Sequence, residues 1–438
     1  MKTSQHSLTN RVLPALAFFA SLAGVIAFAS YPEKSSAASA QGKPLAPLFD
    51  DLGGFSKRVS TSDALAQRYF DQGMMFVFGF NHKEAIRSFE TAAAIDPSLA
   101  IAWWGASFAH GPNINAPMAG DAVPPAIAAL QKAQALLEHA SPWERAYIEA
   151  LSARYSDDPE KERAALDAAY AEAMAKVAKR FPDDNDAAVL HADSVMNTMA
   201  WDYWLADRKT PKPATREVIA TLERVLQRQP DHPGANHALI HLVEAGPEPQ
   251  RGLPSADALK HYAPDAGHLV HMPSHIYMRT GHYHEAVLAN ERAAAADLAY
   301  IANCKAQGFY PGMYYPHNEH FLWWAFTFEG RRADAMAKAD EIITLASSPM
   351  CGTPVLEKPR FTHLRLLTAV RFADWDQILD AKAPPAEDAL DQVMWHWARA
   401  TAFSATGNAR QAGNEAAATK RAAESEGVKA LDNPYLPA

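Results

Sequence analysis

Histidines are concentrated in one part of this 438-residue chain. Ten of the 18 histidines fall between His237 and His320, where an even distribution would place only about three or four. Seven of those ten lie in three short segments, residues 236–244, 268–275 and 317–320. Because imidazole binds metals, transfers protons and donates hydrogen bonds near neutral pH, this concentration predicts a chemical site.

The spacing within these segments is helical. Residues three, four or seven positions apart lie on one face of a helix, so each segment presents its histidines together. Packed helices lie about 8–10 Å apart, and imidazoles from two of them can reach one metal ion. We therefore predict a transition-metal site, with one or more ions. Its candidate ligands are His237, His241, Glu244, His268, His271, His275, His317 and His320.

Ligation by nitrogen suits copper, zinc, nickel and iron. We favour copper over zinc or iron, because an exported location is expected (below) and tyrosines and methionines lie near the histidines, although such residues are also typical of a helical core. These are Tyr277, Tyr310, Tyr314, Tyr315, Met272, Met278 and Met313. Copper or iron would oxidise a small molecule at an open coordination position. Zinc would activate water for hydrolysis, with Glu244 as the base.

Other interpretations stay open at this point. Glu244 is a candidate catalytic base, a metal ligand or an acceptor that orients a histidine. The histidines would also suit a polar groove for an acidic ligand or a proton-linked network without metal. A third class is a metal carrier or a scaffold that binds a protein partner and catalyses nothing.

Composition excludes some partners. Hydrophobic residues make up 48% of the chain and charged residues 21%, which is typical of a globular protein. The net charge of −9 argues against nucleic acid or an anionic membrane as the main partner. Motifs for phosphate binding, dinucleotide binding or a nucleophile elbow are missing from the sequence.

The first residues have the pattern of an export signal. Arg11 is followed by an apolar run from Val12 to Ala29, which ends in the small-x-small cleavage pattern Ala27-Phe28-Ala29. We expect a signal peptide over residues 1–29, a flexible lead-in over 30–59 and export, to a bacterial periplasm. An uncleaved N-terminal anchor is the alternative. Cys304 and Cys351 would pair there only if the fold brings them together.

Alanine-rich helical patterns run through the rest of the chain and predict an all-α fold. A helix, a turn at Phe80-Asn81-His82 and a second helix occupy residues 67–97. The recurring residues there are Tyr69, Gly73, Phe76, Ala85, Phe89, Ala92 and Pro97. Similar turns start at Gly281, Gly330 and Gly407. This pattern resembles the tetratricopeptide repeat (TPR) family, whose unit is 34 residues of paired antiparallel helices, and in its histidines it resembles an exported bacterial subgroup without an established activity.

The resemblance implies a solenoid of antiparallel helix pairs with a concave face; a generic helical bundle is the alternative. We expect N-terminal repeats over 60–230, histidine-rich repeats over 231–345, and C-terminal repeats and a tail over 346–438. Irregular joints are expected near 111–125, 200–215, 246–262 and 300–316. The resemblance also implies which positions of each repeat line the concave groove. With Ala286, Pro230 and Ala335 as anchors for the numbering of three repeats, all eight candidate ligands fall at such positions.

Two segments rich in aromatic and polar residues, 103–118 and 196–204, are candidates to close that groove and bind a small molecule. They would equally cap an irregular joint. The candidate substrate-binding residues are Asn113, Asn115, Asp202 and Tyr315. Of the other histidines, His282 and His284 are expected in an exposed turn. His363 is an outer candidate ligand without an obvious neighbour.

Two prolines affect the candidate helices. Pro316 suits the first turn of a helix that carries His317 and His320. Pro273 predicts either a kink or a helix start, which would leave His268 and His271 on the lead-in. Helix N-termini would lower the pKa of these histidines and favour the neutral, ligating form.

Overall fold

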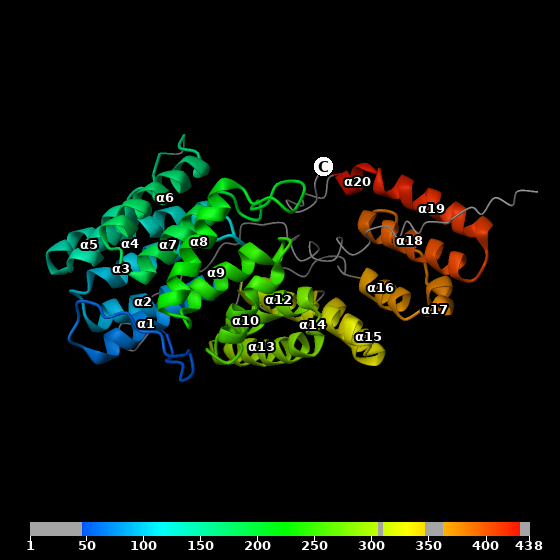
Figure 1. Cartoon of the computed structure of the whole chain (residues 1–438), viewed down its shortest axis with the longest axis horizontal. Coiled ribbons are helices and arrows are strands. Elements are labelled where there is room, and N and C mark those ends of the chain that lie inside the picture. Colours follow the sequence, from blue (N-terminus) through cyan, green and yellow to red (C-terminus); the bar gives the residue numbers. More distant parts are fainter. Residues whose placement is uncertain (1–45, 159, 305–309, 347–361, 430–438) are drawn as a thin grey trace, which may run out of the picture. The chain divides into compact units, whose positions relative to one another are not determined.

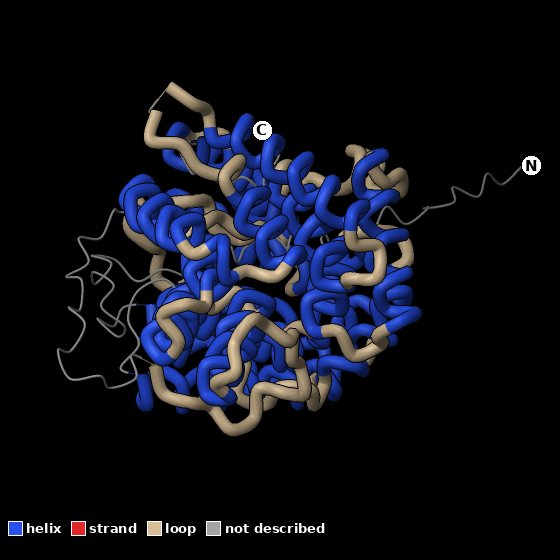
Figure 2. Tube along the Cα trace, turned by 90° about the vertical axis from the view of Figure 1, so that its left-hand side faces the viewer, coloured by secondary structure: helices blue, strands red, loops and turns tan. Residues whose placement is uncertain are grey.

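The computed structural model describes residues 46–158, 160–304, 310–346 and 362–429, and they form two compact units. One unit is the described part of Ser30–Asp374 and the other is that of Trp375–Ala438. The described residues are helices and loops (Figure 2), with isolated bridges only at Asn113–Ala116 and Trp204–Pro211. The predicted all-α class is confirmed.

The larger unit is built from helices that pack against their neighbours in the sequence (Figure 1). Its first half contains α1 (Ala64–Phe78), α2 (His82–Ile95), α3 (Ala100–Ala109), α4 (Val123–Ala135), α5 (Pro142–Leu151), α6 (Arg163–Arg180), α7 (Asn185–Asn197) and α8 (Pro213–Arg228). Its second half contains α9 (Pro233–Glu244), α10 (Leu253–Leu259), α11 (Gly267–His271), α12 (Pro273–Thr280), α13 (Tyr283–Cys304), α14 (Tyr315–Glu329), α15 (Arg332–Ala346) and α16 (His363–Arg371). These sequential antiparallel pairs are the packing of a TPR-type solenoid.

The smaller unit consists of α17 (Trp375–Asp380), α18 (Ala389–Ala405), α19 (Ala409–Ala423) and α20 (Glu426–Lys429). The helices α18 and α19 form one antiparallel pair around the turn at Gly407. His396 and Arg399 of α18 both contact the Glu415 carboxylate of α19, at 2.6 and 2.9 Å. His396 is partly buried in this ion pair.

Left-handed residues make the turns inside the pairs. Gly281 and Gly330 have φ of 83° and 84°, and each lets the following amide return to the preceding helix, as His282 N does to Tyr277 O at 2.9 Å. The first pair closes in the same way, with Asn81 N bonded to Phe76 O at 2.8 Å. There the left-handed residue is Phe80, with φ of 55°. A bulky residue in this conformation is strained and is often held for a functional reason.

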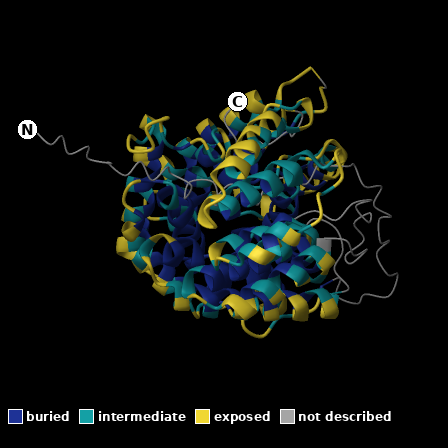
Figure 3. Cartoon of the chain, turned by 90° about the vertical axis from the view of Figure 1, so that its right-hand side faces the viewer, coloured by how far each residue is buried: buried dark blue, intermediate teal, exposed yellow. Residues whose placement is uncertain are grey.

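The apolar stripes of the helices make a continuous core within the larger unit, while exposed residues collect on outward helix faces and loops (Figure 3). Phe89 is fully buried between two helices, because Gly73 of α1 and Gly105 of α3 leave room for its ring. Tyr69, Phe76 and Ala85, which carried the resemblance to the repeat family, are buried as well.

The expected flexible lead-in is ordered over its described part, residues 46–59. Ala46 N donates to Thr91 Oγ1 at 3.2 Å, and Phe49 N donates to Gln72 Oε1 at 3.0 Å. Phe55 is buried between Phe78 and His232. The apolar side chains of residues 46–59 therefore complete the core beside α1.

The expected joints near 111–125 and 200–215 are largely non-helical, whereas the described residues near 300–316 are helical: they belong to the end of α13, to a π-helical turn over Tyr310–Tyr314 and to the start of α14. The joint near 246–262 contains the short helix α10, which packs against α9 and α12. A search of the described residues finds no helix with the length and apolar character needed to cross a bilayer. The expected signal peptide and Cys351 lie outside the described residues.

The packing of Phe89 leads to a prediction about stability. In Gly73→Ala the new Cβ would lie 2.6 Å from Phe89 Cε1, and we expect unfolding to become easier by about 1–3 kcal/mol. Urea denaturation would measure this change. Gly120→Ala is the matched control, because its Cβ would meet nothing within 4 Å. Equal stability of the two variants would contradict the packing described here.

Candidate metal centre

Four helices carry the candidate ligands. His237, His241 and Glu244 lie on α9, His268 and His271 on α11, His275 on α12, and His317 and His320 on α14. Among these helices α9 packs on α12, and α11 packs on α14. The structure thus brings together three segments that are far apart in the sequence.

A new helix, α12, begins at Pro273, and the chain does not turn sharply before it. Met272, the residue before this proline, keeps a right-handed helical conformation, with φ of −50° and ψ of −38°. His271 and His275 therefore stay one helical turn apart, with 2.9 Å between their Nε2 atoms. Pro316 lies in the first turn of α14, as predicted. Both prolines are compatible with the histidine spacing because neither removes a hydrogen bond that the helix needs.

Six of the histidines form two groups, which we call triad 1 and triad 2. Triad 1 is His237, His241 and His268, and triad 2 is His271, His275 and His317. In each triad one nitrogen from every ring lies within 4.8 Å of the other two. Buried triads with this geometry could hold a metal ion.

Triad 2 is the tighter of the two. His271 Nε2 lies 2.9 Å from His275 Nε2 and 3.0 Å from His317 Nε2. A tetrahedral ion with metal–nitrogen distances of 2.0–2.1 Å has ligand nitrogens about 3.3 Å apart, so only small movements would be needed to ligate one. The triads adjoin each other, since the His241 and His275 rings are 5.3 Å apart at their centroids.

Hydrogen bonds on the far side of the rings fix which nitrogen points into triad 1. His237 Nδ1 lies 2.5 Å from Phe78 O, a carbonyl at the end of α1. His241 Nδ1 lies 2.8 Å from the Glu244 carboxylate. Because both partners can only accept, each Nδ1 carries the proton and each Nε2 holds a lone pair. Neither Nε2 has a hydrogen-bond partner among the described residues.

The same arrangement occurs in triad 2. His271 Nδ1 donates to Asn290 Oδ1 at 2.6 Å, and the amide orientation is set because Asn290 Nδ2 donates to Ala286 O. His275 Nδ1 donates to Glu244 Oε2 at 2.6 Å. Two lone pairs therefore face each other across 2.9 Å, which is repulsive unless a cation or a proton lies between them.

Glu244 is shared by the two triads. Its Oε1 accepts from His241 and its Oε2 accepts from His275. Burial opposes ionisation of this carboxyl, but its contacts with His275 and His241, which both donate hydrogen bonds to it, outweigh burial and hold the pKa of Glu244 well below its usual range. Of the three roles that we considered for Glu244, this geometry matches the one that orients metal-binding histidines.

Burial keeps the imidazoles neutral. It lowers the pKa of His237, His268, His271 and His317 well below the ordinary value, and neighbouring imidazoles lower it further. The largest cause of these lowered pKa values is burial, whereas the sequence pattern indicated the helix N-terminus. Each ring of triad 1 is at most 2% exposed, so a proton on it would lose its hydration. Neutral imidazole is the form that binds metals.

A phenylalanine covers each triad. The Phe80 ring lies 4.4, 6.3 and 5.6 Å from the rings of His237, His241 and His268. The Phe321 ring lies 4.8, 4.5 and 4.9 Å from those of His271, His275 and His317. The left-handed conformation at Phe80 thus places an aromatic ring against triad 1.

His320 does not join the triads. Its ring contacts Trp323 at 5.2 Å, and burial lowers its pKa to about 4, with a further contribution from His363. The two residues therefore belong to the same neighbourhood, although no partner was expected for His363. His320 lies three residues after His317 on α14, but only His317 belongs to triad 2.

The candidate substrate-binding residues lie in different places. Asn115 Nδ2 donates to Tyr314 Oη at 3.4 Å, beside His268. The Asp202 carboxylate is 68% exposed and pairs with Lys212, whereas Trp201 next to it contacts the His241 ring. Tyr315 is buried and hydrogen-bonded to Glu319. Asp202 and Tyr315 are thus not brought to the triads.

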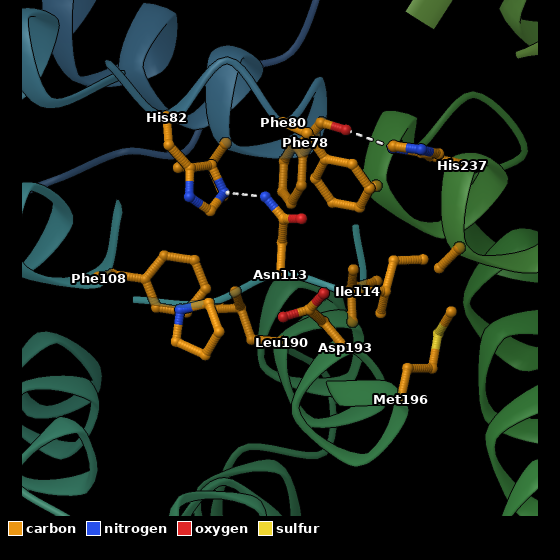
Figure 4. Close-up of a pocket in the computed structure, with 15 residues that line it drawn as sticks. Phe78, Phe80, His82, Phe108, Asn113, Ile114, Leu190, Asp193, Met196 and His237 are labelled. Carbon is orange, nitrogen blue, oxygen red and sulfur yellow. Dashed lines mark hydrogen bonds between the residues drawn. The ribbon is translucent and has the colours of Figure 1, made fainter. Parts of the chain in front are cut away.

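Asn113 lines a small apolar pocket beside triad 1 (Figure 4). Phe78, Phe80 and His237 border this pocket, as does Asp193, whose pKa burial raises to about 6. Asn113 Nδ2 lies 3.5 Å from His82 Nε2 at its edge. His82 is partly buried, and burial lowers its pKa to about 3.

Several residues that shape the site have no signal in the sequence. Phe80, Phe321 and Asn290 are ordinary core or turn residues by type, and the Phe78 carbonyl is a backbone atom. The buried Asp297 also has no signal in the sequence. Burial raises the pKa of its carboxyl to about 7. His282 and His284 are exposed in the turn, as expected.

Comparison with known proteins finds structural resemblance to TPR-containing proteins and no relative by sequence. No family model and no curated protein matches the sequence. Among solved structures, the chain resembles a human IFIT1 dimer with PPP-AAAA (TM-score 0.39, 11% identity, 82% of this chain and 73% of that chain). It also resembles the TPR domain of P58(IPK) (0.21, 13%, 84% and 96%). A third similar structure is the APC/C hetero-tetramer Cut9-Hcn1 (0.27, 13%, 85% and 76%). At these TM-scores the likeness carries no argument about function.

The buried histidines should make stability depend on pH. In the unfolded chain they take up protons below about pH 6.5, whereas in the folded chain the pKa of His320 is about 4 and that of His82 about 3. Stability of the metal-free protein should therefore fall as the pH falls from 7 towards 4, by up to about 1.4 kcal/mol per pH unit for each such histidine.

Urea unfolding at several pH values would measure this dependence. The slope should be smaller in His320→Gln and unchanged in His284→Gln, since His284 is exposed. A stability that rises on acidification over this range would contradict the neutral, buried state of the imidazoles.

Proposed function

We propose that this protein is an exported metalloprotein that binds two transition-metal ions, one in each triad, and oxidises a small molecule. The convergence of Nε2 atoms within each triad carries the proposal. Hydrogen bonds to Phe78 O, Asn290 and Glu244 turn these atoms toward shared points. Such bonds on the outer nitrogen are the usual support of metal-binding histidines.

The ligand type is compatible with copper, which we favour because of the expected export, and with other transition metals. Three neutral nitrogens and no thiolate or carboxylate form each triad, and imidazole suits copper, zinc, iron and nickel. Three protein ligands leave a coordination position open for a reactant. In the zinc hydrolase alternative Glu244 would be the base, but both its oxygens already accept from His241 and His275, so the geometry favours redox chemistry.

The small pocket at Asn113 borders triad 1 and is apolar apart from His82, Asn113, Asp193 and His237. Its free space is close to that of one water molecule, so it would admit only a reactant of a few atoms. The proposal of export rests on the N-terminal sequence pattern alone.

A non-catalytic metal carrier is the second candidate. The observation in its favour is the enclosure of both triads, since Phe80 and Phe321 each contact all three rings of one triad. Enclosure slows release of a bound ion. A carrier would exchange its metal with a chelator and turn over no substrate, whereas an oxidase would retain metal during turnover.

Metal content tests the two triads separately. The protein purified without a histidine tag should hold two metal ions per chain. His268→Ala should lose the ion of triad 1, and His317→Ala should lose that of triad 2, so each variant keeps one. Elemental analysis gives the count, and His284→Ala, outside both triads, is the control. Undiminished metal in both variants would refute the assignment.

Glu244→Gln tests the orienting role. A glutamine offers one acceptor oxygen in place of two and would point an amide N–H at the second imidazole N–H. We expect metal affinity at both triads to fall by about 10–100-fold while the number of sites stays the same. Competition with a chromogenic chelator measures this. Loss of one site with unchanged affinity at the other would show that Glu244 is instead a direct ligand.

A further inference from the structure

A row of tyrosines leads away from triad 1. The Tyr314 ring lies 4.5 Å from the His268 ring at the centroids. Tyr310 follows at 5.1 Å from Tyr314, and Tyr300 at 5.4 Å from Tyr310. All three are buried, and they form a single cluster. The partly buried Ile301 and Cys304 pack against this cluster at its far end.

Two of these phenols have a carboxylate as hydrogen-bond acceptor. Tyr310 Oη donates to Asp297 Oδ1 at 2.9 Å, and Tyr300 Oη is 3.4 Å from Glu84 Oε2 and 3.3 Å from Asn81 Oδ1. A phenol that loses an electron becomes a very strong acid, so it is oxidised readily only where a base can take its proton. Asp297 and Glu84 are placed to do so.

The Tyr310–Asp297 pair is built into the site. Asp297 Oδ2 accepts from Asn318 Nδ2 at 2.7 Å, which ties it to α14. Tyr310 Oη accepts from the His268 backbone N–H at 3.1 Å. A Cβ on Gly267 would lie 2.0 Å from Asp297 Oδ1, so glycine is needed for this contact. The pair thus touches the segments that carry both triads.

We propose that Tyr314, Tyr310 and Tyr300 form a relay that passes single electrons between triad 1 and the Cys304 end of the cluster, with Asp297 and Glu84 as proton acceptors. The relay rests on the proposed redox function. Its role is to deliver electrons to the metal centre during turnover, or to remove an oxidising equivalent when no substrate is bound.

The chemistry balances with a peroxide as oxidant. Tyr310 and Tyr300 would each lose one electron and one proton, with the proton passing to the adjacent carboxylate, which leaves two neutral tyrosyl radicals. A metal held by triad 1 would supply the path for the two electrons to one molecule of hydrogen peroxide, which also takes up two protons that the carboxylates release. The O–O bond of the peroxide breaks and two waters form. A one-electron donor at the Cys304 end would then reduce the radicals.

Electron paramagnetic resonance on the full-length protein tests the relay. Copper-loaded protein, mixed with hydrogen peroxide and frozen rapidly, should show a tyrosyl radical, and ring-deuterated tyrosine should narrow its signal. Tyr310→Phe keeps the ring but cannot form the neutral radical, so most of the signal should be lost while copper content is unchanged.

Tyr277→Phe is the matched control. Tyr277 is also buried and donates to a carboxylate, Asp257, at 2.7 Å, but it is not part of the row. It should leave the radical signal intact. Copper-loaded protein without a tyrosyl radical, or equal signals in the two variants, would overturn the relay alone. Protein that binds no copper or other metal would overturn the proposed function and the relay with it.

Discussion

The structure of the site depends on one carboxylate that two imidazoles share. Glu244 accepts from His241 with one oxygen and from His275 with the other, and so fixes a ring in each triad. Because these bonds hold the proton on Nδ1, both Nε2 lone pairs point inward. The energetic consequence is a buried arrangement of facing acceptors. Such an arrangement is costly on its own and becomes favourable when a cation binds.

The helical scaffold provides the rigidity that this arrangement needs. His237 is oriented by a carbonyl at the end of α1, and His271 by Asn290 on α13. The histidines of α9, α11, α12 and α14 therefore converge on one buried region, together with Phe80 from its strained turn. A site assembled on helices in this way is held more precisely than one carried on loops.

The sequence predicted the helix pairs and most of the site, and the reason is periodicity. Histidines at 237 and 241, or at 271 and 275, share a face in any helix, so their grouping does not depend on the tertiary structure. The separation of His320 from His317 depends on how α14 is rotated against α11 and α16, which spacing alone does not determine. Phe80, Asn290 and the Phe78 carbonyl could not be predicted, because their roles arise only from packing. The packing of residues 46–59 against α1 could not be predicted either, because the few apolar residues of this segment do not follow a helical or strand period.

Anomalous diffraction from crystals of the metal-loaded protein, collected at the absorption edge of the bound metal, tests the central claim most directly. The account predicts two peaks, one within about 2.0–2.1 Å of Nε2 of His271, His275 and His317, and one similarly placed among His237, His241 and His268. Glu244 should lie outside the coordination sphere of both. Peaks only at exposed histidines such as His282 and His284, or no peak at either triad, would contradict it.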